Sequence, residues 1–263
     1  MKLALIQMRV EPGAVEANLA RAEMWMRDAA ASGAEVVLLP EALPFGWMDP
    51  SARLLAEEIP NGKHARRLVE LATELQISVC AGLVERSGQT VFNAAVFVSP
   101  NGEVLLHHRK IHELGIAHDC YGLGDRLAVV DTDCGRIGLM ICADGFAPGQ
   151  VISRTLALMG AQIILSPCAW AVPPDYDHNA TPYGKLWIEN YGAVAREYGV
   201  WIAGCSNVGP IRSGPWAGHK CIGCSLVIGP DGKVKACGDY GEKAEEVMVV
   251  DVACDAGRRT SAE

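Results

Sequence analysis

The sequence predicts an α/β protein in which two similar halves form a four-layer αββα sandwich. This prediction rests on a pattern of strand, helix and strand followed by strand hairpins, which occurs twice along the 263 residues. No change of composition that would mark a linker separates the two halves. We therefore expect a single domain over residues 1–252, followed by a polar C-terminal tail over residues 253–263.

The first half begins with a strand–helix–strand unit. Lys2 to Met8 is short and aliphatic, Ala14 to Ser32 has apolar residues at helical spacing, and Ala34 to Leu39 is a continuous apolar run. Such a connection is right-handed and leaves its two strands parallel. The elements expected next are a helix over His64–Leu75, strands over Ile77–Val84 and Val91–Val98, and a strand over Glu103–His108 after the turn Pro100–Gly102.

The second half repeats this order. Leu127–Asp131 and the buried run Ile137–Ile141 are expected as strands, and Trp170–Pro182, with three prolines, as an irregular loop beside a pocket. The remaining elements are helices over Val151–Met159 and Tyr183–Tyr198, strands over Gln162–Ser166 and Val200–Cys205, a hairpin of Cys221–Ile228 with Lys233–Ala236, and a last strand over Met248–Val252.

Composition excludes several classes of function. The formal net charge of -8, without a basic patch, argues against a nucleic-acid-binding protein. No apolar run approaches the ~18 residues that a membrane span needs. The apolar start of the chain is too short for a signal peptide, so we expect a cytoplasmic protein with no membrane partner. Its ten cysteines are then interpreted as reduced thiols, mostly in the core.

Three chemically useful residues follow predicted strands. Glu41 comes after VVLLP, Lys110 after EVLLHHR, and Cys142 after IGLMI. The carboxyl ends of strands are where α/β sheets collect catalytic groups. A carboxylate can accept a thiol proton, a thiolate can attack a carbon atom, and an ammonium can stabilise the resulting oxyanion. Each residue also has an ordinary interpretation, as a solvated strand end or, for the cysteine, as a small core residue.

The motifs LLPEA around Glu41, HRKIH around Lys110 and GLMICADGFAP around Cys142 occur in this order. Together they resemble the nitrilase superfamily of carbon–nitrogen hydrolases, over a region from Lys2 to about Val252. The resemblance implies the αββα fold and a triad of Glu41 as general base, Lys110 as oxyanion stabiliser and Cys142 as nucleophile. It also implies that no cofactor is needed and that the protein associates as a homodimer or higher homo-oligomer.

One departure from the family pattern lies in the loop after the lysine. The family usually carries a second glutamate there, but in IHELGIAHDCYGLGD the expected position falls near residues 117–119, which include no glutamate. His118 or Asp119 would then substitute, or Glu113 would reach in. We favour His118 as the fourth residue of the catalytic shell, because a histidine exchanges protons near neutral pH.

A second departure follows the cysteine. Members that act on nitriles tend to have Trp-Glu there, and amidase-like branches an aromatic residue followed by Asp. Ala143-Asp144 therefore favours the amidase-like branch. Carbamoyl-amino-acid hydrolases often place an arginine after that Asp, whereas this chain has Gly145-Phe146.

The predicted reaction is cysteine-dependent hydrolysis of a non-peptide C–N bond in a small linear amide, with water, through a thioester. Hydrolysis of a nitrile or an N-carbamoyl compound, or a non-catalytic binding protein of the same fold, are the alternatives. Trp170 and Tyr176 are the candidate substrate-binding residues, and Trp187 and Trp216 are further candidates for the pocket wall.

A metal site is not expected. Cys221 and Cys224 have the spacing of a ligand pair and lie beside His219, but no second pair follows at a suitable distance.

Overall fold

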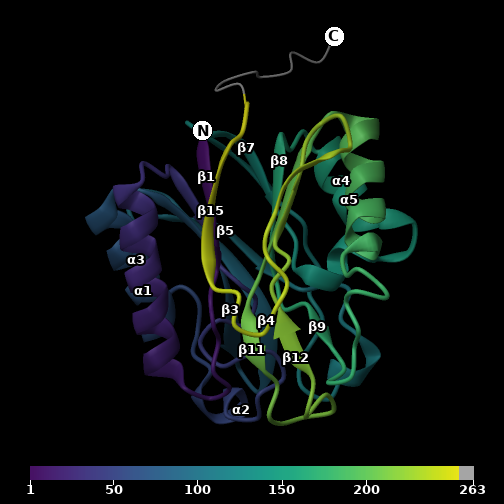
Figure 1. Ribbon diagram of the computed structural model, residues 1–263. Coiled ribbons are helices and arrows are strands. Elements are labelled where there is room, and N and C mark those ends of the chain that lie inside the picture. Colours follow the sequence, from purple (N-terminus) through teal and green to yellow (C-terminus); the bar gives the residue numbers. More distant parts are fainter. Residues whose placement is uncertain (255–263) are drawn as a thin grey trace.

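The computed structural model describes residues 1–254. Two six-stranded sheets pack face to face, with helices α1 and α3 on the outer side of one and α4 and α5 on the outer side of the other (Figure 1). The predicted four-layer αββα sandwich is therefore confirmed. Most of the predicted tail, residues 255–263, lies outside the described residues.

The first sheet has the order β15-β1-β2-β3-β4-β5. Strands β1, β2 and β3 are parallel, as the strand–helix–strand pattern predicts, and the other pairs are antiparallel. The first and last strands of the described chain are thus neighbours, with Lys2 opposite Asp251. The strands are β1 (Lys2–Gln7), β2 (Val36–Leu38), β3 (Ser78–Ser87), β4 (Thr90–Val98), β5 (Val104–Arg109) and β15 (Glu246–Asp251).

The second sheet has the order β14-β13-β10-β8-β7-β6 and the same plan. Three central parallel strands, β7, β8 and β10, are flanked by antiparallel pairs. This likeness between the sheets agrees with the prediction of two similar halves. The strands are β6 (Val129–Thr132), β7 (Gly135–Leu139), β8 (Ile163–Cys168), β10 (Trp201–Ser206), β13 (Leu226–Ile228) and β14 (Val234–Cys237).

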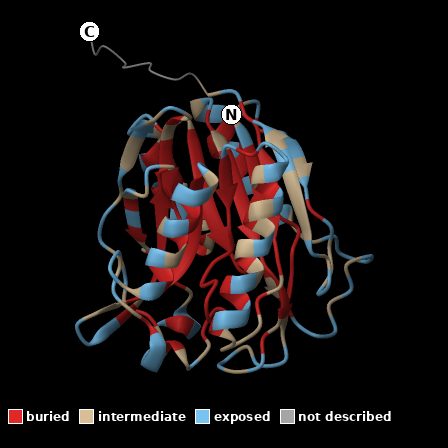
Figure 2. Cartoon of the chain, turned by 90° about the vertical axis from the view of Figure 1, so that its left-hand side faces the viewer, coloured by how far each residue is buried: buried red, intermediate tan, exposed pale blue. Residues whose placement is uncertain are grey.

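The helices cover the sheets with their apolar faces. In α1, Leu19, Ala22 and Met26 are buried at helical spacing, and Figure 2 shows helices with exposed outer surfaces in front of buried strands. The helices are α1 (Val15–Ala31), α2 (Ala52–Leu55), α3 (Lys63–Leu75), α4 (Val151–Leu158) and α5 (Lys185–Tyr198), with short 3₁₀ turns η1 (Gly115–Ala117), η2 (Cys142–Phe146) and η3 (Pro148–Gln150). No helix within residues 1–254 is both long and apolar enough to cross a membrane.

The space between the sheets is filled by side chains from both. Leu38 and Phe97 of the first sheet belong to the same buried cluster as Leu139 and Ala203 of the second. A thiol also joins the sheets, because Cys205 Sγ donates to the carbonyl oxygen of Ile6 at 3.2 Å. This packing fixes the ends of strands from both sheets relative to one another.

The prediction of one strand over Cys221–Ile228 is wrong. The segment forms β12 (Lys220–Ile222) and β13 (Leu226–Ile228), separated by Gly223 and Cys224 with φ of 68° and 59°. Left-handed backbone at two consecutive residues ends a β-ladder. Strand β12 pairs instead with β9 (Ala171–Val172) and β11 (Val208–Pro210) in a three-stranded sheet.

Candidate active site

The three residues predicted at strand ends line one cavity. Glu41 follows β2, Lys110 follows β5 and Cys142 follows β7, and all three border a space of about 150 Å³. The first two come from one sheet and the cysteine from the other. The face-to-face packing of the sheets therefore brings together groups that are far apart in the sequence.

Glu41 is held by backbone from both sheets. Its N–H donates to the carbonyl oxygen of Cys168 at 3.2 Å, and its side chain is buried. Strand β3 approaches it through Gly82, where a Cβ atom would lie only 2.5 Å from the Cα atom of Glu41. Since real Cβ contacts are longer than this, glycine is required for so close an approach.

Lys110 lies between two carboxylates. Its Nζ donates to Glu41 Oε1 at 2.8 Å and to Glu113 Oε1 at 2.9 Å. The amide of Asn93, on β4, donates to Glu41 Oε1 at 2.7 Å and to Glu113 Oε2 at 3.1 Å. All four side chains are buried, so these charge-assisted hydrogen bonds fix the positions of the two carboxylates.

Burial and mutual charge set the protonation of this cluster. Burial raises the pKa of Glu41, Lys110 opposes this rise, and the Glu113 carboxylate adds to it. Burial alone would lower the pKa of Lys110, but Glu41 and Glu113 hold it well above its ordinary value. Lys110 therefore stays protonated, and the neighbouring Glu41 carboxylate accepts a proton more readily than an ordinary glutamate.

Cys142 lies in a sharp turn. Its φ of 44° is left-handed, a conformation that non-glycine residues rarely adopt, and its N–H donates to Ser166 Oγ at 3.1 Å. Burial raises the pKa of the Cys142 thiol well above its ordinary value; a hydrogen bond with the Cys168 thiol and the Glu41 carboxylate also raise it, whereas Lys110 lowers it. The resting residue is therefore a neutral thiol, which needs a base before it can attack.

Asp144 joins the turn at the cysteine to the segment that carries the lysine. Its Oδ2 accepts from the N–H of Ile141 at 2.9 Å and lies 2.9 Å from Nε2 of His108, while its Oδ1 accepts from the N–H groups of Ile111 at 3.1 Å and His112 at 2.7 Å. Asp144 is fully buried. It therefore positions Cys142 relative to Lys110 without itself bordering the cavity.

The cavity wall is largely apolar and aromatic. Trp170 stacks on Trp187 with ring centroids 4.7 Å apart, and Trp47 meets Trp216 edge to face at 5.2 Å. Besides Glu41, Lys110 and Cys142, the lining residues are Trp47, Leu114, Ala143, Phe146, Ala169, Trp170, Ala171, Tyr183, Leu186, Trp187 and Trp216.

Of the two predicted substrate-binding residues, the structure places Trp170 at the cavity and Tyr176 away from its lining. The hydroxyl of Tyr176 donates to the carbonyl oxygen of Thr181 at 2.6 Å, and its ring packs near Tyr183 and Tyr240. The structure therefore does not place Tyr176 in the cavity wall, because the loop folds its ring onto other aromatic residues. Tyr183 reaches the cavity in its place.

The structure places Glu113, rather than His118, beside the lysine. His118 is exposed, and its Nε2 lies 3.3 Å from the carbonyl oxygen of Glu113. Three residues after Lys110, the chain turns so that the buried Glu113 carboxylate points back to the ammonium. The preference for His118 over Glu113 is thus reversed. Asp119 is exposed as well.

Sequence reasoning missed Asn93 and the anchoring contacts of Asp144. A signal for Asn93 was present, because it is the one polar residue in the run VFNAAVFV of β4. A buried amide in an apolar strand must find hydrogen-bond partners. For the long-range contacts of Asp144 no local signal exists, since the N–H groups of Ile111 and His112 lie more than thirty residues away in the sequence.

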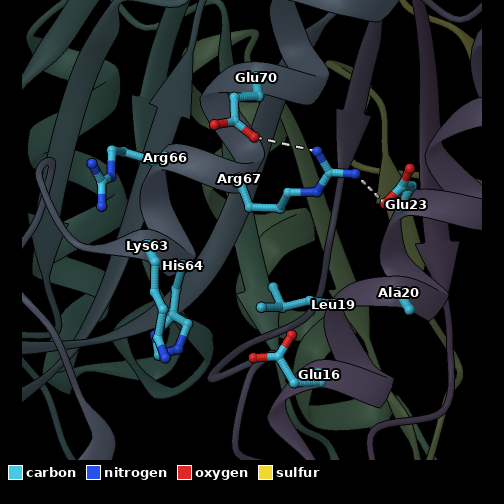
Figure 3. Close-up of a pocket in the computed structure, with 9 residues that line it drawn as sticks. All are labelled: Glu16, Leu19, Ala20, Glu23, Lys63, His64, Arg66, Arg67 and Glu70. Atoms are coloured by element: carbon cyan, nitrogen blue, oxygen red, sulfur yellow. Dashed lines mark hydrogen bonds and ion pairs between the residues drawn. The ribbon is translucent and has the colours of Figure 1, made fainter.

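A second, wider cavity of about 500 Å³ lies between α1 and α3. Among its charged residues, Arg67 contacts Glu23 and Glu70 (Figure 3). None of its lining residues is a cysteine, serine or threonine, so it is not the candidate active site. Within residues 1–254, no group of three or more His, Cys, Asp or Glu side chains is arranged to hold a metal ion.

Comparison with known proteins agrees with this geometry. The family model for carbon-nitrogen hydrolase matches residues 2–261. A nitrilase of Pyrococcus abyssi is 30% identical, with 96% of this chain and 89% of that protein covered. The chloroplastic omega-amidase of Arabidopsis thaliana is 31% identical, with 93% of this chain and 66% of that protein covered.

Among solved structures, an amidase from Nesterenkonia sp. AN1 superimposes with a TM-score of 0.80 at 25% identity, covering 98% of this chain and 96% of that one. Fold, site geometry and the match along nearly the whole sequence point to the same family. The prediction from three motifs is therefore confirmed, and the chain belongs to the carbon–nitrogen hydrolase family, the nitrilase superfamily.

Proposed function

We propose that this protein hydrolyses a small, uncharged amide through a thioester on Cys142. The observation that carries the proposal is that a thiol, a buried carboxylate and a buried ammonium border one small cavity. Acyl transfer needs these three groups as nucleophile, base and oxyanion partner. Similarity to the Nesterenkonia amidase, described with acrylamide added to its active-site cysteine and in complex with butyramide, supports the same chemistry here.

In the first step, Glu41 removes the thiol proton of Cys142 and the sulfur attacks the amide carbonyl carbon. An ammonium has three N–H donors, and two of those on Lys110 are engaged by Glu41 and Glu113. The third is the donor that we assign to the oxyanion of the tetrahedral intermediate. Collapse of this intermediate breaks the C–N bond, and the proton on Glu41 leaves with the nitrogen as ammonia.

In the second step, Glu41 removes a proton from water, and the hydroxide attacks the thioester carbonyl. The intermediate collapses to the carboxylic acid, and the Cys142 sulfur regains its proton from Glu41. Amide and water are thus converted to acid and ammonia, and the enzyme returns to its starting state. The raised pKa of Glu41 suits this role, because the same group must gain and lose a proton in both halves of the cycle.

Glu113 is proposed to keep Lys110 charged and in place, with Asn93 as the link between the two carboxylates. Removal of Glu113 would leave the ammonium with one fixed carboxylate instead of two. This role replaces the proton-exchange role predicted for His118.

The substrate class follows from the cavity. A space of about 150 Å³ walled by tryptophan, phenylalanine and leucine side chains fits a short apolar acyl group. Lys110 is the only cation among its lining residues, and it is already paired with carboxylates. A second charged group on the substrate would be desolvated there without a partner, which is unfavourable. We therefore favour short aliphatic primary amides over amides that carry a carboxylate.

The test is ammonia release from a panel containing butyramide, succinamate, butyronitrile and an N-carbamoyl amino acid. We expect turnover of butyramide to exceed that of succinamate, and Cys142→Ala to abolish it. Ammonia release that persists in Cys142→Ala would overturn the mechanism. Preference for succinamate would overturn the substrate class alone, and preference for the nitrile or the carbamoyl compound would favour those alternatives. If the protein turns over no panel member and forms no covalent adduct with any of them at Cys142, the result would fit the non-catalytic alternative.

A further inference from the structure

A second thiol, that of Cys168, lies near the proposed nucleophile Cys142, and the proposed hydrolysis does not use it. Strands β7 and β8 are parallel neighbours, and their register pairs Leu139 with Leu165. Three residues further along the chain lie Cys142, in the turn after β7, and Cys168, the last residue of β8. The Met140 N–H still donates to the carbonyl oxygen of Leu165 at 3.1 Å, so the two chains continue side by side towards these cysteines.

The contacts of Ser166 bring the two cysteines into one cluster. Ser166 Oγ accepts from the Cys142 N–H at 3.1 Å and lies 3.4 Å from Cys168 Sγ. The Cys168 thiol is also among the groups that raise the pKa of the Cys142 thiol. A disulfide needs a Cα–Cα distance of about 4.4–6.8 Å. The spacing of about 4.8 Å between adjacent strands brings the chain to this range where β7 ends and the turn to Cys142 begins.

The two thiols differ in access. Cys142 borders the cavity and is half-buried, whereas Cys168 is fully buried behind it, near the hydroxyl of Tyr191. A small oxidant entering through the substrate cavity therefore meets Cys142 first. In such a pair, the second thiol can react with a sulfenic acid formed on the accessible cysteine.

We propose that Cys142 and Cys168 form a reversible disulfide that protects the nucleophile from irreversible oxidation by peroxides. The Cys142 thiolate, formed by proton transfer to Glu41, attacks one peroxide oxygen; the O–O bond breaks and Cys142 becomes a sulfenic acid, with water or an alcohol released. The Cys168 sulfur then attacks the Cys142 sulfur, the S–O bond breaks, and water leaves with the Cys168 proton. The peroxide is reduced and the two thiols are oxidised by two electrons.

The consequence for activity rests on the proposed function, since a disulfide occupies the sulfur that must attack the amide. Reduction by an external dithiol would restore both thiols. Without Cys168, the sulfenic acid would remain open to a second peroxide and would proceed to a sulfinic acid, which a dithiol does not reverse.

The experiment exposes the wild-type protein to several equivalents of hydrogen peroxide and follows mass and ammonia release. Trypsin is expected to leave Cys142 in fragment 137–154 and Cys168 in fragment 155–185, each with a single cysteine, so the cross-link is identified directly. We expect these two fragments linked, a mass loss of about 2 Da, and an activity loss of about tenfold or more that dithiothreitol reverses.

Cys168→Ala, with Cys168→Ser as a second variant of different size and polarity, is expected to gain two oxygens on fragment 137–154 and to stay inactive after dithiothreitol. The matched control is Cys237→Ser, which removes an exposed thiol and should behave like wild type. The proposal is overturned if wild-type Cys142 gains two oxygens without a cross-link, or if both Cys168 variants recover as fully as wild type. Because the cross-link is read by mass, this outcome is independent of whether the proposed hydrolysis is correct.

Discussion

Asp144 Oδ1 accepts a hydrogen bond from the backbone N–H of His112 at 2.7 Å, across thirty-two residues of sequence. The turn at Cys142 and the segment after Lys110 thus share one buried anchor. In Asp144→Asn, one oxygen becomes an NH₂ group that faces backbone N–H donors. We expect a stability loss of about 1–3 kcal/mol from the unsatisfied groups, and a fall in kcat of about 10²-fold from misplacement of the nucleophile.

Thermal unfolding and amide kinetics would measure both effects. Asp125→Asn is the control, because that side chain is 83% exposed. A variant at position 144 that lost stability but kept wild-type kcat would show that the anchor is structural only.

Glu41 gives the reaction a recognisable pH dependence. Its carboxylate must be unprotonated to act as a base, and burial raises its pKa above 4.5. Activity is then lost as the pH falls through this raised pKa, so the acidic limb of kcat/KM should have its midpoint above that of an ordinary glutamate. Glu41→Gln should lower kcat about 10²–10⁴-fold. A midpoint at or below 4.5 would contradict the assignment of this limb to Glu41.

Two variants can test whether Glu113, rather than His118, is the fourth residue that supports the reaction. Glu113→Gln removes one charge beside Lys110 and should lower kcat by about 10²-fold, through a less well positioned oxyanion partner. His118→Ala alters an exposed side chain and should change kcat by less than about twofold. The reverse order of effects, measured as kcat with a saturating amide, would restore the prediction made from sequence.

Trp216 is a half-buried part of the cavity wall, packed between Trp47 and His219. Trp216→Ala should lengthen the cavity and raise kcat/KM for hexanamide relative to butyramide about tenfold, since each added methylene gains about 0.8 kcal/mol when buried. The ratio is the informative quantity, because it cancels any general loss of activity. An unchanged ratio would place the acyl chain elsewhere.

Gly82 has no chemistry of its own, but it lets β3 approach Glu41. In Gly82→Ala, the added Cβ would lie 2.5 Å from the Cα atom of Glu41 and 2.6 Å from the carbonyl oxygen of Pro40. We expect displacement of Glu41, a kcat loss of at least about tenfold, and a destabilisation of about 1–3 kcal/mol. Gly115→Ala is the control, since a Cβ there meets no atom within 4 Å.

The sequence predicted the layers and the strand ends well, because both follow from short-range pattern. Continuous apolar runs for the strands and apolar residues at helical spacing for the helix locate β1, α1 and β2 to within a few residues. The same pattern failed at Cys221–Ile228, where an apolar, strand-like composition hides two left-handed residues. At a non-glycine residue such as Cys224, a positive φ is set by the surrounding packing rather than by the residue's own propensity.

The sequence predicted which three residues would meet at the cavity, whereas of the groups that support them it named only Glu113, as an alternative to His118. Glu41, Lys110 and Cys142 each follow a recognisable strand, and the three motifs occur in a family order. Glu113 reaches Lys110 only because the chain reverses after β5, which the loop sequence does not reveal. Asn93 contacts residues fifty-two positions before it and twenty after it. Such contacts depend on sheet register, which composition leaves open.

The pairing of β1 with β15 also has a consequence for biosynthesis. Lys2 lies opposite Asp251, so one side of β1 finds its partner only after almost all of the described chain has been made. At about 5–20 residues per second, the ribosome takes roughly ten to fifty seconds to deliver that partner. Until then an aliphatic strand edge remains unpaired and prone to association with other chains. Completion of the first sheet is therefore a late event in the synthesis of the described chain.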